Sequence, residues 1–355
     1  MNNWLIQTEG KEGLDTLDLN NDDVNWIIPI AGKGKRLRPH SLSRPKPLFP
    51  VAGKPVVARL METLHKISGK PDNVVFVVSP WQDTSLIPQI VESVVGSEVN
   101  VHIRVQEKAE GTAHAIYQAG DLLNGPVMIA FGDTIFKPSQ YVLPEADGAI
   151  WTYRVEDPSS YGVVLTDQEG IITGMVEKPD TPISHKAIIG VYYVREGQVL
   201  KKHIEHLIEN NIRGKGNEFQ LTDALEMMVK EGLKLVALPV SQWLDTGNHK
   251  LLLNALKTIL TEEGTHISKD AILKNCTIIN PVYIGPYVHI EDSVIGPHTA
   301  IEEGTQIDNS VLKESVVLEN CKIENIVANH SVIGENSVWK RKMDRLILGP
   351  YSVWE

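Results

Sequence analysis

The first two thirds of the chain alternate between short apolar runs and amphipathic stretches. The runs at 27–30, 74–78 and 127–130 have the length and composition of buried strands. Between the first two runs, apolar residues recur at helical spacing from Val56 to Leu64, and Gly111 to Leu123 has a second helical pattern. Strands that alternate with helices in this way predict an α/β domain with a mostly parallel sheet covered by helices.

A different period begins after Thr265, beyond a connecting helix that is predicted from Asn248 to Leu260. Aliphatic residues then follow steps of six with one slip of a residue, at Ile272, Ile278, Ile284, Ile290, Ile295, Ile301 and Ile307. A step of six is neither helical nor alternating. It is typical of a β-helix, in which each side of a triangular coil directs one aliphatic residue inward. The pattern weakens through Val317, Ile323, Val327 and Ile333, so we expect about four coils.

These two periods divide the chain into four parts. We expect an N-terminal extension at 1–24, an α/β domain at 25–262, a β-helix at 263–340 and a C-terminal tail at 341–355. So few coils bury little surface alone, which predicts packing on the α/β domain or on another subunit, and hence a homo-oligomer. Apolar side chains near the C-terminus are available to close the open end of the β-helix: Trp339, Leu346, Leu348, Tyr351 and Trp354.

Charge and cysteine content narrow the class of protein. The formal net charge of −11 argues against a nucleic-acid-binding surface, which needs a basic face. The two cysteines, Cys276 and Cys321, are interpreted as core residues of the second domain. No basic-then-apolar signal pattern opens the chain, and no apolar run approaches the roughly 20 residues that span a bilayer. We therefore expect a cytoplasmic protein without nucleic-acid or membrane partners.

The strongest chemical signal is a glycine loop directly after the strand at 27–30. It reads Gly32-Lys33-Gly34-Lys35-Arg36-Leu37-Arg38-Pro39 and is followed by Arg44-Pro45-Lys46-Pro47-Leu48 and Val51-Ala52-Gly53-Lys54-Pro55. The backbone N–H groups of such a loop cradle phosphates, and Arg36, Arg38 and Lys46 supply positive charge nearby. Two familiar loops are excluded, because Leu37 replaces the third glycine of a dinucleotide-binding fingerprint and Pro55 replaces the Ser or Thr of a P-loop.

Further motifs follow the loop in order along the chain. They are Gln106 with Gly111-Thr112-Ala113, then Phe131-Gly132-Asp133, Tyr161-Gly162-Val163, Glu177-Lys178-Pro179, Ile189-Gly190-Val191 and Trp243-Leu244-Asp245-Thr246-Gly247. Together with the loop they resemble the sugar-1-phosphate nucleotidyltransferases, and in particular the glucose-1-phosphate thymidylyltransferases. The loop matches the family signature G-x-G-x-R-L-x-P…P-K-P-L-x-P-V-x-G-K-P almost throughout. The resemblance implies a Rossmann-like sheet with helices on both faces, followed by a short left-handed β-helix.

The resemblance also implies a role for each matching residue. Contacts to the nucleotide are expected from Ala31, Gly32, Gly34, Lys35, Gln106, Gly111 and Thr112, and contacts to the sugar phosphate from Gly162, Glu177, Lys178 and Gly190. Arg36, Lys46 and Asp133 are expected to act in catalysis, with Asp133 and Asp245 holding Mg²⁺. These residue types suit a reaction between two anions, which needs cations, a divalent metal and positioning more than a protein nucleophile.

Three positions call for separate comment. Lys35 stands where the family usually has a small hydroxyl residue, and His40 stands where an aliphatic residue is common; we interpret His40 as a packing variant. Asp223 lies in a segment that resembles the start of a helix near the family's sugar pocket, so it is a secondary candidate that also fits helix capping.

The implied substrates are a nucleoside triphosphate and a sugar 1-phosphate. Gln106 favours thymine or uracil, because an amide offers one donor and one acceptor to the imide edge, whereas glucose 1-phosphate follows from the resemblance alone. A mannose-1-phosphate guanylyltransferase or another NDP-sugar pyrophosphorylase is an alternative, and so is a non-catalytic regulatory homologue. A last alternative adds acyl transfer in the β-helix, with His289, His298 or His330 as general base.

Overall fold

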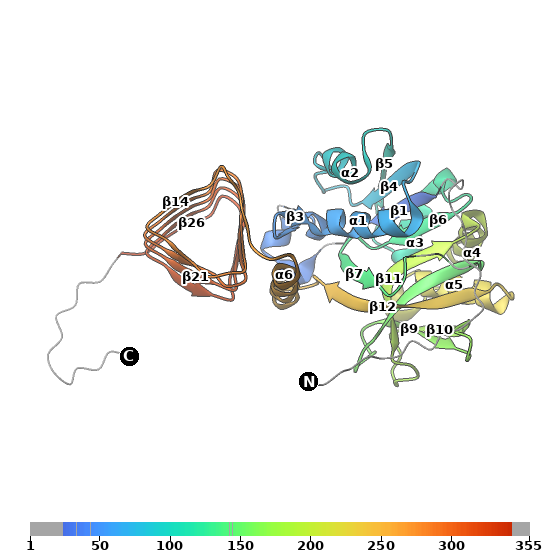
Figure 1. Cartoon of the computed structure of the whole chain (residues 1–355). Coiled ribbons are helices and arrows are strands. Elements are labelled where there is room, and N and C mark those ends of the chain that lie inside the picture. Colours follow the sequence, from blue (N-terminus) through green and yellow to red (C-terminus); the bar gives the residue numbers. More distant parts are fainter. Residues whose placement is uncertain (1–23, 33, 43, 142, 144, 343–355) are drawn as a thin grey trace. The chain divides into compact units, whose positions relative to one another are not determined.

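The computed structural model describes residues 24–32, 34–42, 44–141, 143 and 145–342. The expected N-terminal extension and C-terminal tail lie outside the described residues, apart from Val24, Arg341 and Lys342. The chain forms two compact units (Figure 1). The first unit comprises the residues up to Gly32 together with Val57–Trp243. The second comprises the segment from Lys33 to Val56 together with the chain from Leu244 onwards.

The first unit is built on a sheet that has ten strands within the described residues, in the order β5-β4-β1-β6-β11-β8-β12-β7; in addition, β9 pairs with β11, and β10 pairs with β9. The strands are β1 (Asn25–Pro29), β4 (Asn73–Val78), β5 (Asn100–Val105), β6 (Val127–Ala130), β7 (Thr134–Pro138), β8 (Gly148–Arg154), β9 (Gly162–Thr166), β10 (Ile172–Glu177), β11 (Lys186–Val194) and β12 (Leu235–Asp245). Strands β5, β4, β1 and β6 run parallel, and β12 runs parallel to β8. Strand β11 runs antiparallel to both β6 and β8, so β8 and β12 point in the same direction as β6. Most strands of the sheet therefore share one direction, as predicted.

Helices cover both faces of this sheet. They are α1 (Val56–Ser68), α2 (Ile87–Val95), α3 (Thr112–Tyr117), α4 (Gly197–Glu209) and α5 (Leu221–Lys230). On β1, successive side chains point to opposite faces. Trp26 Nε1 donates a hydrogen bond to Ser68 Oγ of α1 at 3.0 Å, whereas Ile27 packs into a core shared with α3, α4 and α5. The α/β fold expected from the sequence is therefore confirmed.

One helix differs in length from its prediction. The pattern from Gly111 to Leu123 predicts a single helix, but α3 ends at Tyr117 and a 3-10 turn, η4 (Gly120–Leu122), follows it. Gly120 has φ +65, a left-handed conformation that interrupts right-handed helical geometry. None of the described helices is long and apolar enough to cross a membrane.

The second unit contains α6 (His249–Glu263) and a triangular β-helix. Asn248 caps α6, because its side chain accepts a hydrogen bond from Leu251 N at 3.0 Å. Three parallel sheets form the sides of the triangle seen in Figure 1: β13-β16-β19-β22-β25, β14-β17-β20-β23-β26 and β15-β18-β21-β24. Their five, five and four strands within the described residues make four complete coils and two strands of a fifth. The short left-handed β-helix expected from the period of six is confirmed.

The strands of the β-helix are two or three residues long. The first two coils hold β13 (His266–Ile267), β14 (Ile272–Lys274), β15 (Thr277–Ile278), β16 (Val282–Ile284), β17 (His289–Glu291) and β18 (Val294–Ile295). The later coils hold β19 (Thr299–Ile301), β20 (Gln306–Asp308), β21 (Val311–Lys313), β22 (Val316–Val317), β23 (Lys322–Glu324), β24 (Val327–Asn329), β25 (Val332–Ile333) and β26 (Val338–Lys340).

Two of the residues predicted to point inward point outward instead. Ile272 and Val327 are 52% and 83% exposed. The inner positions belong to their neighbours, because Leu273 pairs with Ile290, and Ala328 pairs with Leu312. At the corner that follows the sheet containing β14, two successive inward residues are one position closer in sequence than the period of six predicts. The aliphatic pattern in the sequence shows this shorter step only between Ile290 and Ile295. Cys321 lies in the core of the β-helix and Cys276 packs against it, as interpreted from the sequence.

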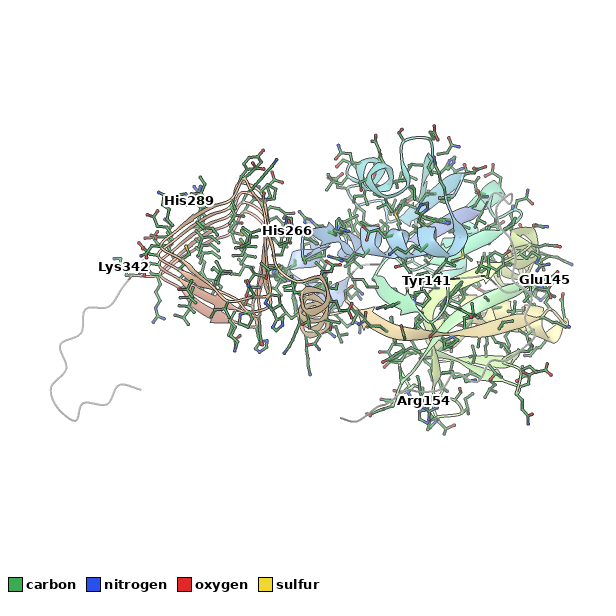
Figure 2. The ribbon with its side chains drawn as sticks, viewed as in Figure 1. Tyr141, Glu145, Arg154, His266, His289 and Lys342 are labelled. Carbon is green, nitrogen blue, oxygen red and sulfur yellow. The ribbon has the colours of Figure 1, made fainter. Side chains whose placement is uncertain are left out.

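The corners of the coils require left-handed backbone conformations. Asn275, Asp292, Asn309 and Asn325 stack at one corner with φ between 45° and 62°, where short polar side chains are tolerated. His298 and His330 occupy another corner with φ 54° and 50°. Figure 2 shows His289 on the outer side of the coil, where it belongs to β17.

We predict that the inward side chains of the β-helix carry its stability. Ile290 has no exposed surface, so Ile290→Ala should lower the free energy of unfolding by about 2–5 kcal/mol through the cavity it leaves. Val327→Ala, at a site the sequence pattern had placed inside, should cost less than about 0.5 kcal/mol. Chemical denaturation measures both. Equal losses at the two positions would contradict the register.

Candidate active site

In the second unit, the glycine loop folds into three short 3-10 turns: η1 (Lys35–Leu37), η2 (His40–Leu42) and η3 (Lys46–Leu48). Gly34 has φ +54, and a Cβ atom there would lie 2.9 Å from Ser41 Cβ, so the loop requires glycine at this point. Ser41 Oγ and Leu37 N both donate to Gly34 O at 2.8 Å. Leu37, which breaks the dinucleotide fingerprint, is fully buried and anchors the loop.

Predicted catalytic and metal-binding residues from distant parts of the sequence meet in this unit. Lys46 Nζ lies 3.7 Å from Asp245 Oδ1, and Lys46 is 8% exposed. Asp245 ends β12, and its Oδ1 accepts a hydrogen bond from Gly247 N at 2.7 Å. A Cβ atom on Gly247 would lie 3.2 Å from Arg36 Nη2, so this glycine leaves room for the guanidinium. The structure thus places Arg36, Lys46 and Asp245 together, while Lys35 is exposed on the loop.

In the first unit, the candidate residues gather where parallel strands end. Ala31 and Gly32 follow β1, and Asp133 lies in the turn between β6 and β7. Gly132 N donates to Pro29 O at 3.3 Å, which brings this turn to the end of β1. The carboxyl ends of parallel strands are the usual place for ligands in open α/β sheets, and Asp133 lies at such an end.

Two polar residues that the sequence analysis did not select hold the end of β1 in shape. Ser79 Oγ donates to Ala31 O at 2.6 Å, and Gln82 Nε2 donates to Ile30 O at 2.8 Å. Both side chains are buried, and Ser79 N also donates to Gln82 Oε1 at 2.6 Å. Their position directly after the strand at 74–78 is the signal that could have found them.

The segment expected to bind the base is tightly packed. Gln106 is 5% exposed, and its Nε2 contacts Gly111 O at 3.2 Å and His114 Nδ1 at 3.0 Å. Gly111 has φ +125, and a Cβ atom there would lie 2.3 Å from Phe219 O. Thr112 Oγ1 accepts from Leu221 N at 2.8 Å, so its side chain also organises the start of α5.

His114 also belongs to this segment, although no sequence motif marks it. Its Nε2 lies 3.7 Å from Glu110 Oε2, and Arg213 Nη2 donates to Glu110 Oε1 at 3.0 Å. Burial lowers the pKa of His114, and the nearby Arg213 acts in the same direction while Glu110 opposes it. A neutral imidazole is therefore favoured near neutral pH, which leaves one ring nitrogen as an acceptor.

The residues expected to bind the sugar phosphate lie around the end of β10. Glu177 pairs with Gly162, and a Cβ atom on Gly162 would lie 2.8 Å from Glu177 Oε2. Glu177 Oε2 accepts a hydrogen bond from Thr222 Oγ1 at 2.8 Å, and Lys178 Nζ lies 3.4 Å from Glu177 Oε1. Lys178 is exposed.

The two remaining candidates for sugar-phosphate binding are Gly190 and Asp223. Gly190 has φ +82 and packs against the ring of Phe131, next to the Asp133 turn. Burial, reinforced by Glu177 and Glu226, raises the pKa of Asp223. The charge of Glu177 therefore acts on Asp223, and Asp223 stays a secondary candidate for binding the sugar phosphate.

The carboxylates suit Mg²⁺ by their chemistry. Within the described part of the chain, no three His, Cys, Asp or Glu side chains gather as a complete metal site. Mg²⁺ takes one or two carboxylates and completes its shell with water and substrate phosphates, and Asp133 and Asp245 each carry a carboxylate of this kind.

Comparison with known proteins identifies the family. A model of the nucleotidyl transferase family matches residues 26–262, and the chain belongs to this family. It is 30% identical over 343 residues to the bifunctional protein GlmU of Methanocaldococcus jannaschii, covering 88% of this chain and 78% of that protein. It is 27% identical to a glucose-1-phosphate thymidylyltransferase of Streptomyces antibioticus, covering 92% of this chain and 98% of the relative.

A solved structure supports the fold. The crystal structure of a UDP-glucose pyrophosphorylase in complex with UDP-glucose aligns with a TM-score of 0.57 and 21% identity, covering 68% of this chain and 99% of that one. The protein is therefore a nucleotidyltransferase of the sugar-1-phosphate class, as the sequence motifs indicated.

We predict that Gly111→Ala destabilises the protein strongly. Its φ of +125 and the approach to Phe219 O leave no room for a methyl group, so the free energy of unfolding should fall by more than about 3 kcal/mol. Gly120→Ala is the matched control: it also has positive φ but nothing within 4 Å, and should cost about 1 kcal/mol. Chemical denaturation of the two variants checks this, and equal costs would contradict it.

Proposed function

We propose that this enzyme joins a uridine or thymidine triphosphate to a sugar 1-phosphate, giving an NDP-sugar and pyrophosphate. Glucose 1-phosphate is the proposed sugar substrate. The name of the Streptomyces antibioticus relative supports a pyrimidine nucleotide and a hexose, and the orientation of the Gln106 amide carries the proposal.

The Gln106 amide can point only one way. Gly111 O is a backbone carbonyl and can only accept, so the amide nitrogen of Gln106 must face it. The same nitrogen lies 3.0 Å from His114 Nδ1, which accepts from it when the neutral imidazole carries its proton on Nε2. Gln106 Oε1 then has no hydrogen-bond donor among the described residues and is available to a ligand.

An available amide oxygen selects bases by their hydrogen-bonding edge. Uracil and thymine present an N3–H donor, which suits Oε1, whereas cytosine presents an acceptor at N3 and would be repelled. Guanine also carries an N–H on its pairing edge, so the guanylyl alternative belongs in the assay. The methyl group that distinguishes thymine from uracil is worth only about 1–3 kcal/mol, so we propose that both are used.

The proposed reaction is a direct in-line transfer. A phosphate oxygen of the sugar 1-phosphate attacks the α-phosphorus, and the bond to the leaving pyrophosphate breaks. The loop N–H groups around Gly34 hold the triphosphate, Arg36 neutralises charge on the pyrophosphate, and Lys46 stands where the two anions meet. Asp245, at 3.7 Å, keeps the buried Lys46 ammonium in place. Bound Mg²⁺, held by Asp133 and Asp245, would neutralise and orient the phosphates. Lys178 and Glu177 bind the sugar phosphate and the sugar hydroxyls.

We further propose that the enzyme is a cytoplasmic homo-oligomer. The outward valines of β21 and β24, Val311 and Val327, are 40% and 83% exposed, and such apolar positions favour contact with another copy. Light scattering on the intact protein tests this, and a monomer would overturn it.

The central test is a matrix of UTP, dTTP, CTP and GTP against glucose, mannose and N-acetylglucosamine 1-phosphates, with pyrophosphate release as the readout. We expect the highest kcat/KM with UTP or dTTP and glucose 1-phosphate in Mg²⁺. The highest kcat/KM with GTP and mannose 1-phosphate would favour the guanylyl alternative, and no release with any pair would favour a regulatory homologue.

We predict that Lys46→Ala lowers kcat roughly 100-fold and changes KM for the triphosphate little, because its charge matters most when the two anions meet in the transition state. Arg36→Ala should act mainly on KM for the triphosphate. Asp133→Asn and Asp245→Asn should each remove most Mg²⁺-dependent turnover. Lys340→Ala, on β26, is the control. An unchanged kcat in folded Lys46→Ala would remove this residue from the catalytic group.

We predict that His114 sets the base preference through Gln106. His114→Phe removes one of the two partners of Gln106 Nε2, leaves Gly111 O alone to hold the amide, and should lower the preference for UTP over CTP roughly tenfold. Acid should have the same effect, since a protonated His114 presents a donor to Nε2. The pKa of His114 is lowered, so the loss should appear only below about pH 6.5. His206→Phe, an exposed histidine on α4, is the control.

A further inference from the structure

The three faces of the β-helix differ in the exposure of their outward side chains, and on one face these side chains are covered by other parts of the chain. The outward positions of β16, β19, β22 and β25 are Tyr283, Ala300, Val316 and Val332. Ala300 and Val316 are fully buried although they point away from the coil's own core, and α6 packs against β19. On the other two sheets, the outward Val327 and Val338 are 83% and 66% exposed. We call the outward side of β16, β19, β22 and β25 the loop-bearing face.

We call the glycine loop and the residues that follow it, up to Pro55, the phosphate loop. A bidentate ion pair attaches this loop to the same side of the β-helix. Arg44 Nη1 and Nη2 donate to Glu319 Oε1 and Oε2 at 2.9 and 3.1 Å, and the two side chains are 19% and 27% exposed. Glu319 follows β22. Parallel hydrogen bonds from one guanidinium to one carboxylate fix direction as well as distance, so this pair sets the position of the loop segment between η2 and η3.

A second attachment lies at the end of the loop. Gly53 N donates to Glu302 Oε1 at 3.1 Å, and Glu302, directly after β19, is 6% exposed. Gly53 has φ +79, and a Cβ atom there would lie 2.2 Å from Cζ of Tyr283. The Tyr283 ring therefore packs directly on the glycine backbone. Burial, together with Glu302 and Glu303, raises the pKa of Tyr283 to about 12, so the ring stays neutral.

A third attachment involves His40, which the sequence analysis treated as a packing variant. His40 Nε2 lies 3.1 Å from Val332 O, and His40 Nδ1 lies 3.0 Å from His249 Nε2 at the start of α6. Since Val332 O can only accept, His40 carries its proton on Nε2 and accepts from His249 through Nδ1. One imidazole thus ties the loop both to β25 and to α6. The three attachments reach four successive coils.

We propose that the β-helix positions the phosphate loop for nucleotidyl transfer, with Glu319 and Glu302 as positioning residues that act through Arg44 and Gly53. The inference rests on the proposed function of the loop. The loop consists of short turns and the small β2 (Pro50–Val51) and β3 (Lys54–Pro55) pair, so it has little regular structure to hold Arg36 and Lys46 in register. A support that removes this freedom before the substrate arrives lowers the cost of binding and of reaching the reactive geometry.

A charge reversal tests the ion pair. Arg44→Glu and Glu319→Arg should each lower kcat/KM for the triphosphate roughly tenfold or more, mainly through KM, because each places like charges together. The double variant restores opposite charges and should recover to within about threefold of the unaltered enzyme. Glu319→Gln, which keeps the size of the side chain, should give a smaller loss if the reversed singles fail to fold.

The control is a second ion pair on another face. Lys340 Nζ lies 2.7 Å from Glu324 Oε2, and the two residues pair on the neighbouring strands β26 and β23 of another sheet of the β-helix. Reversing this pair should leave kcat and KM unchanged. Unchanged kinetics in the folded Arg44 and Glu319 single variants, or a double variant that stays as impaired as the singles, overturns the proposal.

Hydrogen exchange separates this proposal from the proposed function. In the unliganded protein, the amides of Leu37 and Phe49 donate within the loop to Gly34 O and Lys46 O. Glu319→Gln should speed their exchange severalfold, and the Lys340–Glu324 reversal should not. If the unaltered protein releases no pyrophosphate with any substrate pair, the proposed function fails, while the exchange rates still decide whether the β-helix holds the loop. Equal exchange in the two variants would falsify the positioning role.

Discussion

The proposed reaction depends on holding cations ready for polyanionic substrates in a protein whose own net charge is −11. Positive charge has to be concentrated locally, and a buried cation must keep a partner or it loses too much hydration energy. Lys46 meets this constraint by lying 3.7 Å from Asp245 while it is 8% exposed. A carboxylate at this distance stabilises the lysine before the substrate binds and is itself the right kind of ligand for a divalent cation.

The same constraint explains why backbone geometry is so tightly specified around the loop. Gly34 and Gly53 both adopt left-handed conformations with a neighbour too close for a side chain. Leu37 is buried as an anchor, whereas the adjacent Arg36 is exposed. A loop made of such short turns has little regular structure of its own, so its conformation depends mostly on the neighbouring residues that it contacts. The three attachments to the β-helix and α6 supply that definition within one compact unit.

In the first unit, hydrogen bonds within the protein fix the orientation of two candidate side chains. The buried Gln106 amide has its nitrogen committed to Gly111 O and His114, so its oxygen is the atom left to a ligand. Glu177 is held by Thr222 beside Gly162, where the absent side chain leaves room. In both cases a protein hydrogen bond occupies one function of a side chain and leaves another function open. The proposed selectivity rests on the function that remains.

The sequence by itself determined the family, the mostly parallel sheet, the β-helix and the identity of most candidate site residues, because strand period, the six-residue step and the signature motifs are local patterns. It could not determine the register of every coil: Ile272 and Val327 point outward, since the register depends on a corner whose length shows only in the strand pairing. It also could not reveal His114, Ser79 or the bond between Arg44 and Glu319. These residues matter through contacts between segments that only tertiary packing brings within hydrogen-bonding distance. The tertiary structure alone decided that the phosphate loop belongs to the same compact unit as the β-helix, because that assignment rests on contacts made far along the chain.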